Sequence, residues 1–131
     1  MRIFIFVTLV AGAAFASSLD DGLHALTAGD WTRAEQQLAV ASREEPANFH
    51  ARFNHAAALR EMGRNDEAIS EYRASLDLAR TEPQRSDALY GIALAKDSMG
   101  DNSGWSEYLR YAGKYRNEQA AAAIARERLG M

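Results

Sequence analysis

The chain of 131 residues repeatedly places apolar side chains three or four positions apart and separates these stretches by short polar turns. This spacing is the period of an amphipathic helix, and no stretch shows the strict alternation of a half-buried strand. The pattern therefore predicts an all-α protein. We predict seven helices: over residues 18–28, 32–45, 46–62 and 66–80, two within the stretch 83–115 with the first beginning at Pro83, and one over 117–129.

Turn and cap residues agree with these boundaries. Gly29 follows the first predicted helix and can adopt the left-handed conformation that ends a helix. Pro46 and Pro83 each suit the first turn of a new helix, where the missing amide costs nothing. Ser18 and Asp21 form an S-x-x-D pair, which predicts a capping box at the start of the first helix.

A sequence repeat runs through the middle of the chain. Four positions recur at one constant spacing: Gly29, Ala34, Leu38 and Ala41 return as Gly63, Ala68, Tyr72 and Ser75. Pro46 and Pro83, by contrast, are three positions further apart than this spacing. We therefore expect three extra residues between Ser75 and Pro83, which would lengthen the fourth helix or its exit loop by about one turn.

The third repeat leaves its register open near Trp105. The longer offset between the prolines places Trp105 where the other repeats have Ala34 and Ala68. Either the preceding turn is one residue shorter, which brings Gly104 to the small position, or the last helix pair splays around the indole. We favour the shorter turn.

As a set, these small and large positions resemble the tetratricopeptide repeat, a helix-turn-helix unit of about 34 residues. The resemblance is clearest in the stretch FNHAAALREMGRNDEAISEYRASLDLA. It implies three such units in a right-handed superhelix, with close helix crossings where Gly22 or Ala56 faces a small residue such as Ala34 or Ala68. The implied domain spans 17–131, with units at about 18–45, 46–82 and 83–115 and a capping helix at about 117–129.

The resemblance also implies a binding site on the concave surface, which the first helix of each unit forms. Carried over position by position, the groove is lined by Leu19, Leu23, Leu26, Phe53, Asn54, Ala57, Arg60, Tyr90, Gly91, Leu94 and Asp97. Only Asn54 belongs to the residues of the carboxylate clamp that grips acidic peptide ends, so such a clamp is disfavoured. The groove is instead suited to an apolar peptide or helix. The alternative is that these side chains simply fill the core.

A second candidate interface is an aromatic stripe on the sixth predicted helix. Its members follow one another at spacings of three or four positions: Trp105, Tyr108, Tyr111 and Tyr115. Such a stripe either packs under the alanine-rich last helix or forms a surface for a partner or a second copy. Exposure of Trp105 would favour the second interpretation.

Residues 1–16 look like a secretory signal peptide. A basic start at Arg2 precedes an apolar run, and Ala14-Phe15-Ala16 has the small-x-small pattern of a cleavage site. We expect cleavage after Ala16. The alternative is an uncleaved anchor, although the apolar run from Ile3 to Ala16 falls short of the roughly 20 residues that span a bilayer.

Charge and composition exclude several function classes. Loss of residues 1–16 removes Arg2 from the 15 Lys and Arg and leaves 14 against 18 Asp and Glu, a net charge near −4, which argues against nucleic-acid binding. The chain has no cysteine and hence no disulfide, thiolate metal site or thiol nucleophile. His50 and His55 lie five positions apart, not the four that align two metal ligands on a helix. We expect neither an enzyme nor a cofactor or metal.

Two functions remain in view. The first is an exported adaptor that docks a peptide or helix of a cell-envelope protein in its groove, with no membrane span in the mature form. The second is a structural or weakly self-associating subunit of an envelope assembly that uses the aromatic stripe. The expected location is the periplasm, with secretion or anchoring by an uncleaved signal as alternatives.

Overall fold

A computed structural model describes residues 17–112 and 119–131 of the chain. Over these residues it contains helices and turns and no strand, so the predicted all-α class is confirmed. The helices of the described ranges are α1 (Ser18–Ala28), α2 (Trp31–Glu44), α3 (Phe49–Glu61), α4 (Asn65–Leu78), α5 (Glu82–Asp97), α6 (Ser103–Ala112) and α7 (Gln119–Arg128).

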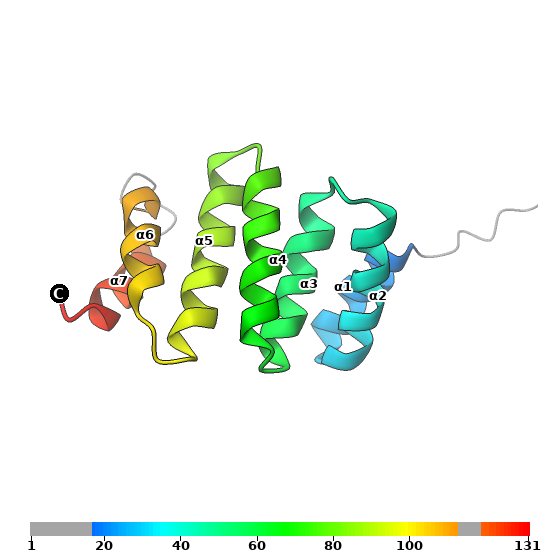
Figure 1. Cartoon of the computed structure of the whole chain (residues 1–131), viewed down its shortest axis with the longest axis horizontal. Helices are drawn as coiled ribbons and strands as arrows, with labels where there is room; N and C mark the ends of the chain where they lie inside the picture. The colour runs from blue at the N-terminus through cyan, green and yellow to red at the C-terminus, as the bar shows by residue number, and fades with distance from the viewer. Residues whose placement is uncertain (1–16, 113–118) are drawn as a thin grey trace, which may run out of the picture.

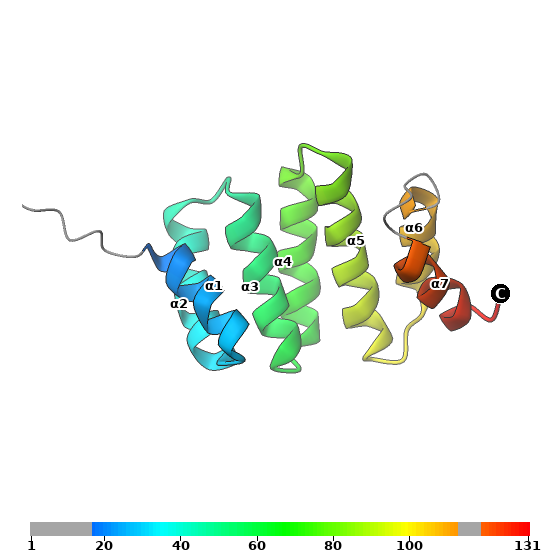
Figure 2. The same cartoon turned by 180° about the vertical axis from the view of Figure 1, so that it is seen from behind.

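The helices form a row two layers deep. Each helix packs against the one before and the one after it, and α3 also contacts both α1 and α5. Figure 1 looks onto the layer that contains α2, α4 and α6, and Figure 2 shows α1, α3 and α7 from behind. The pair α1 and α2 lies at one end of the row, and α6 and α7 lie at the other. Neighbouring contacts of this kind build an elongated array.

The repeat spacing is retained between α2 and α4. Both helices have 14 residues, and their bounds differ by 34 at each end. The three extra residues are therefore not in α4 or its exit loop, and that expectation is wrong. They lie in α5, which has 16 residues against 13 in α3. The linker before α5 is even shorter than the one before α3, at residues 79–81 against 45–48.

The cap at the start of α1 is shifted by one residue from its prediction. The Ser17 hydroxyl accepts a hydrogen bond from the Asp20 amide at 3.1 Å, and the Asp20 carboxylate accepts one from the Ser17 amide at 3.4 Å. Ser17 and Asp20 are thus the capping box, because Ser18 is already helical. Gly29 ends α1 with φ of 75°, as expected.

The two prolines differ in role. Pro83 lies in the first turn of α5, after the cap residue Thr81, as predicted. Pro46 lies instead in a turn before α3, which begins only after Asn48. The Asn48 side chain caps α3 by accepting from the Ala51 amide at 3.2 Å. Because that cap sits two residues after Pro46, the expectation that Pro46 opens the helix is wrong.

Glycines permit close contacts between neighbouring helices. A Cβ at Gly104 would lie 2.7 Å from the Ala93 Cα, so α6 approaches the backbone of α5 through this residue. Gly104, not Trp105, therefore makes the close contact, as favoured above. The expected shorter turn is wrong, because the linker before α6 covers residues 98–102 and is longer than the linker 62–64 before α4. Gly22 likewise allows α1 to approach α2, although it faces Leu38 and not the smaller Ala34.

Three clusters of buried apolar side chains follow one another along the row. The N-terminal cluster consists of Ala25, Ala34, Leu38 and Ala58. The central cluster consists of Ala56, Leu59, Ala68, Tyr72 and Ile92. The C-terminal cluster consists of Leu89, Ala93, Trp105, Tyr108, Ala122 and Ala125. In the ranges 17–112 and 119–131, no helix has the length and apolar character needed to cross a membrane.

Candidate protein-binding surface

The residues predicted to line a groove lie on α1, α3 and α5, the first three helices of one layer (Figure 2). Nine of them are half-buried, so each has one side in the core and another toward solvent. We refer to these nine as the odd-helix face: Leu19, Leu23, Leu26, Phe53, Asn54, Ala57, Arg60, Tyr90 and Leu94. Asp97 is also half-buried. Gly91 does not belong to this face, because it is buried against the Tyr72 ring.

The core holds most of the apolar members of the odd-helix face in place. Leu19 and Leu26 pack against the N-terminal cluster. Phe53 packs against the central cluster, and its ring centroid lies 5.4 Å from that of Phe49 and 5.5 Å from that of Tyr72. Leu19, Leu26 and Phe53 therefore each have one side in the core and another toward solvent. Both interpretations of the sequence, a groove surface and a filled core, apply to them in part.

Tyr90 and Leu94 pack against the C-terminal cluster. The Tyr90 ring lies 5.6 Å from Trp105 and 5.4 Å from Tyr108, so its removal would also disturb the fold. Leu23 and Ala57 belong to none of the three clusters. These two are accordingly the members of the face best suited to carry a binding test.

The polar members of the face are engaged within the chain. The Asn54 Nδ2 donates to the His50 carbonyl at 2.8 Å, one helical turn earlier. The Arg60 Nε donates to the Tyr72 hydroxyl at 3.3 Å, and Arg60 Nη2 lies 3.4 Å from the Glu61 carboxylate. Asn54 thus satisfies a neighbouring carbonyl. The face offers carbon surface more than free hydrogen-bonding groups.

The aromatic stripe on α6 is largely buried. Trp105 is fully buried and Tyr108 retains 1% of its exposure, because both lie in the C-terminal cluster between α5 and α7. They therefore cannot form an exposed interface, and that interpretation is wrong for them. Tyr111 is exposed. Tyr115 lies outside the described residues.

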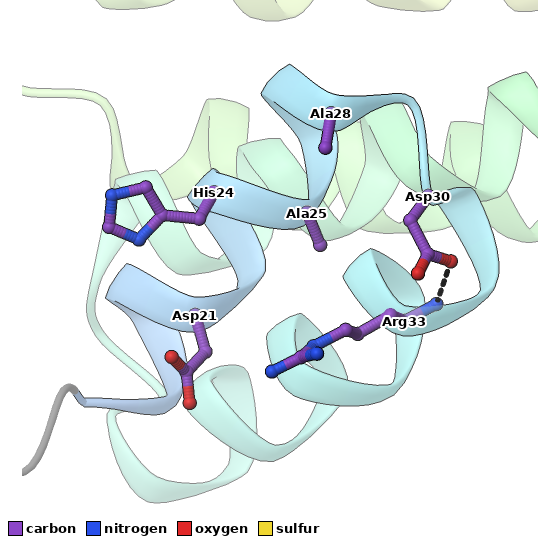
Figure 3. A pocket seen from close by; sticks show the side chains of 6 residues that line it. All are labelled: Asp21, His24, Ala25, Ala28, Asp30 and Arg33. Atoms are coloured by element: carbon purple, nitrogen blue, oxygen red, sulfur yellow. Dashed lines mark hydrogen bonds between the residues drawn. The ribbon is translucent and has the colours of Figure 1, made fainter.

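Hollows also occur away from the odd-helix face. Figure 3 shows one of about 260 Å³ between α1 and α2, lined by Asp21, His24, Ala25, Ala28, Asp30 and Arg33. The remaining helices lie behind this pair in the view, so the hollow opens at the outer end of the row. This hollow was not predicted from the sequence. Its signal was the occurrence of Asp21, His24, Ala25 and Ala28 at helical spacing on one side of α1.

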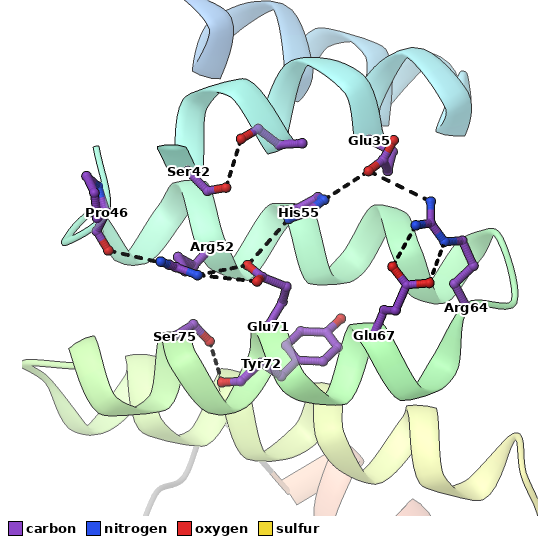
Figure 4. Close-up of polar contacts among 11 residues, drawn as sticks. Glu35, Ser42, Pro46, Arg52, His55, Arg64, Glu67, Glu71, Tyr72 and Ser75 are labelled. Atoms are coloured by element: carbon purple, nitrogen blue, oxygen red, sulfur yellow. Dashed lines mark hydrogen bonds and ion pairs between the residues drawn. The ribbon is translucent and has the colours of Figure 1, made fainter. Parts of the chain in front are cut away.

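A second feature that was not predicted from the sequence is a charged cluster across α2, α3 and α4 (Figure 4). His55 of α3 lies between two carboxylates, with Nε2 3.2 Å from Glu35 of α2 and Nδ1 3.4 Å from Glu71 of α4. Arg52 lies 3.3 Å from Glu71, and Arg64 lies 3.8 Å from Glu35. His55 is half-buried, and its Nε2 lies within hydrogen-bonding distance of the Glu35 carboxylate.

The charged cluster consists of ion pairs between neighbouring helices. Its carboxylates face basic groups, and within 17–112 and 119–131 no group of three or more His, Asp and Glu residues is arranged to hold a metal ion. Arg64 also contacts Glu67 at 2.6 Å. The hydrogen bond to Arg64 holds the pKa of the Glu67 carboxyl below its ordinary value. The cluster joins three helices of the array by ion pairs that remain in contact with solvent.

The buried phenol of Tyr72 makes the stability of the fold depend on pH in the alkaline range. Burial of the phenol raises its pKa above the ordinary value of 10.0, against the opposing effect of the nearby Arg60 guanidinium. The unfolded chain therefore loses this proton first. Its contribution to stability is complete below pH 10 and is lost as the pH rises above that value.

We expect the free energy of unfolding, measured with urea between about pH 8 and about pH 11, to fall more steeply for the wild type than for Tyr72→Phe. Below pH 10 the variant should be less stable by about 1 kcal/mol, because it lacks the hydrogen bond from Arg60. Parallel pH profiles of the two proteins would contradict this expectation, because they would mean that the fold does not raise the pKa of the Tyr72 phenol.

The comparisons with known proteins name no family for the chain, since no protein-family model matches it and a search of curated proteins finds no match.

Proposed function

We propose that this chain is an exported protein-binding module of the tetratricopeptide type, which holds a peptide or helix of a cell-envelope protein on its odd-helix face. In this proposal α1 to α6 form three repeat units in a right-handed superhelix, and α7 caps the last. The equal lengths of α2 and α4 and the constant offset between their bounds support the repeat assignment.

The observation that carries the proposed function is the state of the odd-helix face. On the alternate helices α1, α3 and α5 it presents half-buried aliphatic and aromatic side chains, most of which pack against the core, while its polar members Asn54 and Arg60 are hydrogen-bonded within the chain. Side chains fixed in this way lose little further entropy on binding. A partner that covers them gains about 25 cal/mol for each Å² of apolar surface removed from water.

Leu23→Glu combined with Ala57→Glu is expected to abolish partner capture. Each change places a charge on the face without removing a member of a core cluster. The full chain would be exported from a bacterial host, purified with an affinity tag, and used to capture partners from an envelope extract for mass spectrometry. Two buried charges at an interface should weaken binding by well over tenfold.

The matched control is Gln36→Glu combined with Ser70→Glu, which adds the same charge on exposed positions of α2 and α4. Thermal unfolding would verify that both variants fold. The proposal predicts that the control retains every specific partner of the wild type. Equal capture by the wild type and by both variants would assign binding to another surface.

A further inference from the structure

The two ends of the row carry opposite charge. Residues 17–45, which form α1 and α2, contain six acidic and two basic residues. The described residues 103–112 and 119–131, which include α6 and α7, contain two acidic and three basic residues. The charge of the chain is thus polarised along the array, from a negative first end to a positive last end.

The last end presents an apolar helix face with charged borders. On α7 the side chains of Ala122 and Ala125 are buried, and the opposite side exposes Ala120, Ala123 and Ile124. These three share one helix face because they are three and four positions apart. Arg126 follows Ala123 by three positions and Arg128 follows Ile124 by four, so the arginines border the apolar face on either side. Both are exposed.

The first end presents a hollow of matching character. The cavity of about 260 Å³ between α1 and α2 is lined by Ala25 and Ala28, with Asp21 and Asp30 beside them (Figure 3). The guanidinium at its edge belongs to Arg33. Two carboxylates, a guanidinium and the His24 imidazole therefore surround the two alanines of this hollow.

The same pattern with opposite sign occurs on α7. There the arginines at 126 and 128 border the apolar face, and Glu127 lies on it, three positions after Ile124. Within its own chain Arg128 lies 3.6 Å from Asp97, with more than half of its side chain exposed. Arg126 forms no ion pair with the residues that the structure describes. Arg126 is therefore available to a neighbour.

We propose that the chain associates head to tail with a second copy of itself, with the exposed face of α7 seated in the hollow between α1 and α2 of the next molecule. Ile124 enters the alanine-lined hollow. Arg126 faces Asp21 or Asp30, and Glu127 faces Arg33. The contact uses two different surfaces and does not close on itself, so it builds linear oligomers that grow with concentration. Ala120 and Ile124 also line a hollow with Tyr90, so the contact borders the odd-helix face at that residue. The inference does not depend on the proposed function.

The test is a charge exchange across the contact, measured by sedimentation velocity over a range of concentrations on protein exported from the full chain. Asp21→Arg reverses a charge beside the hollow at the first end, and Arg126→Glu reverses a charge on α7 at the last end. Like charges placed in contact oppose association strongly, so each variant alone should associate at least about tenfold more weakly than the wild type. An equimolar mixture of the two restores an attractive pair at every contact between unlike variants and should associate again.

Salt gives a second readout. Raising the ionic strength from about 0.05 M to about 0.5 M should weaken the wild-type association, because the ion pairs border solvent. Circular dichroism verifies that the variants retain their helices. The proposal is overturned by a wild type that stays monomeric at every concentration, by growth that stops at a dimer, or by a mixture that associates no better than its components.

Discussion

Replacing Trp105 with alanine is expected to lower the free energy of unfolding by about 3–5 kcal/mol, the largest effect of any single change considered. The indole is fully buried in the C-terminal cluster and lies 5.6 Å from the Tyr90 ring and 6.2 Å from the Tyr108 ring. Its loss leaves a cavity between α5 and α7 that alanine side chains cannot fill. Urea unfolding followed by circular dichroism measures the change.

The matched control is Trp31→Ala, which truncates the other tryptophan of the chain. Trp31 is exposed at the start of α2, so its loss should cost less than about 1 kcal/mol. Equal effects of the two substitutions would contradict the burial of Trp105. They would also reopen the interpretation of α6 as an aromatic interface.

Gly91→Ala is expected to destabilise the chain by roughly 1–3 kcal/mol, although the same exchange in an open helix is stabilising by about 0.5–1 kcal/mol. The sign reverses because a Cβ at this position would lie 2.3–2.8 Å from three carbons of the Tyr72 ring. Tyr72 is 1% exposed and cannot move aside. The added methyl group must therefore separate α5 from α4.

A double-mutant cycle isolates this contact. Tyr72→Leu removes the aromatic ring, and in that background Gly91→Ala should lose most of its cost, which gives a coupling energy of about 1 kcal/mol or more. Additive effects of the two substitutions would mean that the destabilisation arises elsewhere.

The helices and their order could be predicted from the sequence because they follow from local signals. Apolar spacing, Gly29 and Pro83 located the elements to within a few residues. The repeat offset placed Trp105 at a small position, and Gly104 was the favoured alternative because a close helix contact requires a small residue.

The extra turn of α5 was assigned to the wrong helix for a physical reason. The two prolines suggested equivalent positions, but Asn48 caps α3 two residues after Pro46. Proline spacing alone cannot distinguish a helix start from the turn before it.

The candidate site could be predicted only in part. The resemblance to the tetratricopeptide repeat implied which helices share a face, but helical periodicity cannot divide a half-buried side chain between core and solvent. Tyr90 shows this, because its ring joins a cluster formed by α5, α6 and α7. The ion pairs of His55 could not be predicted from the sequence either, because Glu35 and Glu71 lie on two other helices and approach it only when the helices pack.

The most direct test of protein binding through the odd-helix face is photo-crosslinking in the cell. A photoreactive phenylalanine analogue would replace Ala57 on α3 in the exported full chain, and in a parallel strain it would replace Ser70 on α4. We expect a discrete adduct with another envelope protein at position 57 and none at position 70. Adducts at position 70 alone, or the same adducts at both positions, would contradict binding through this face.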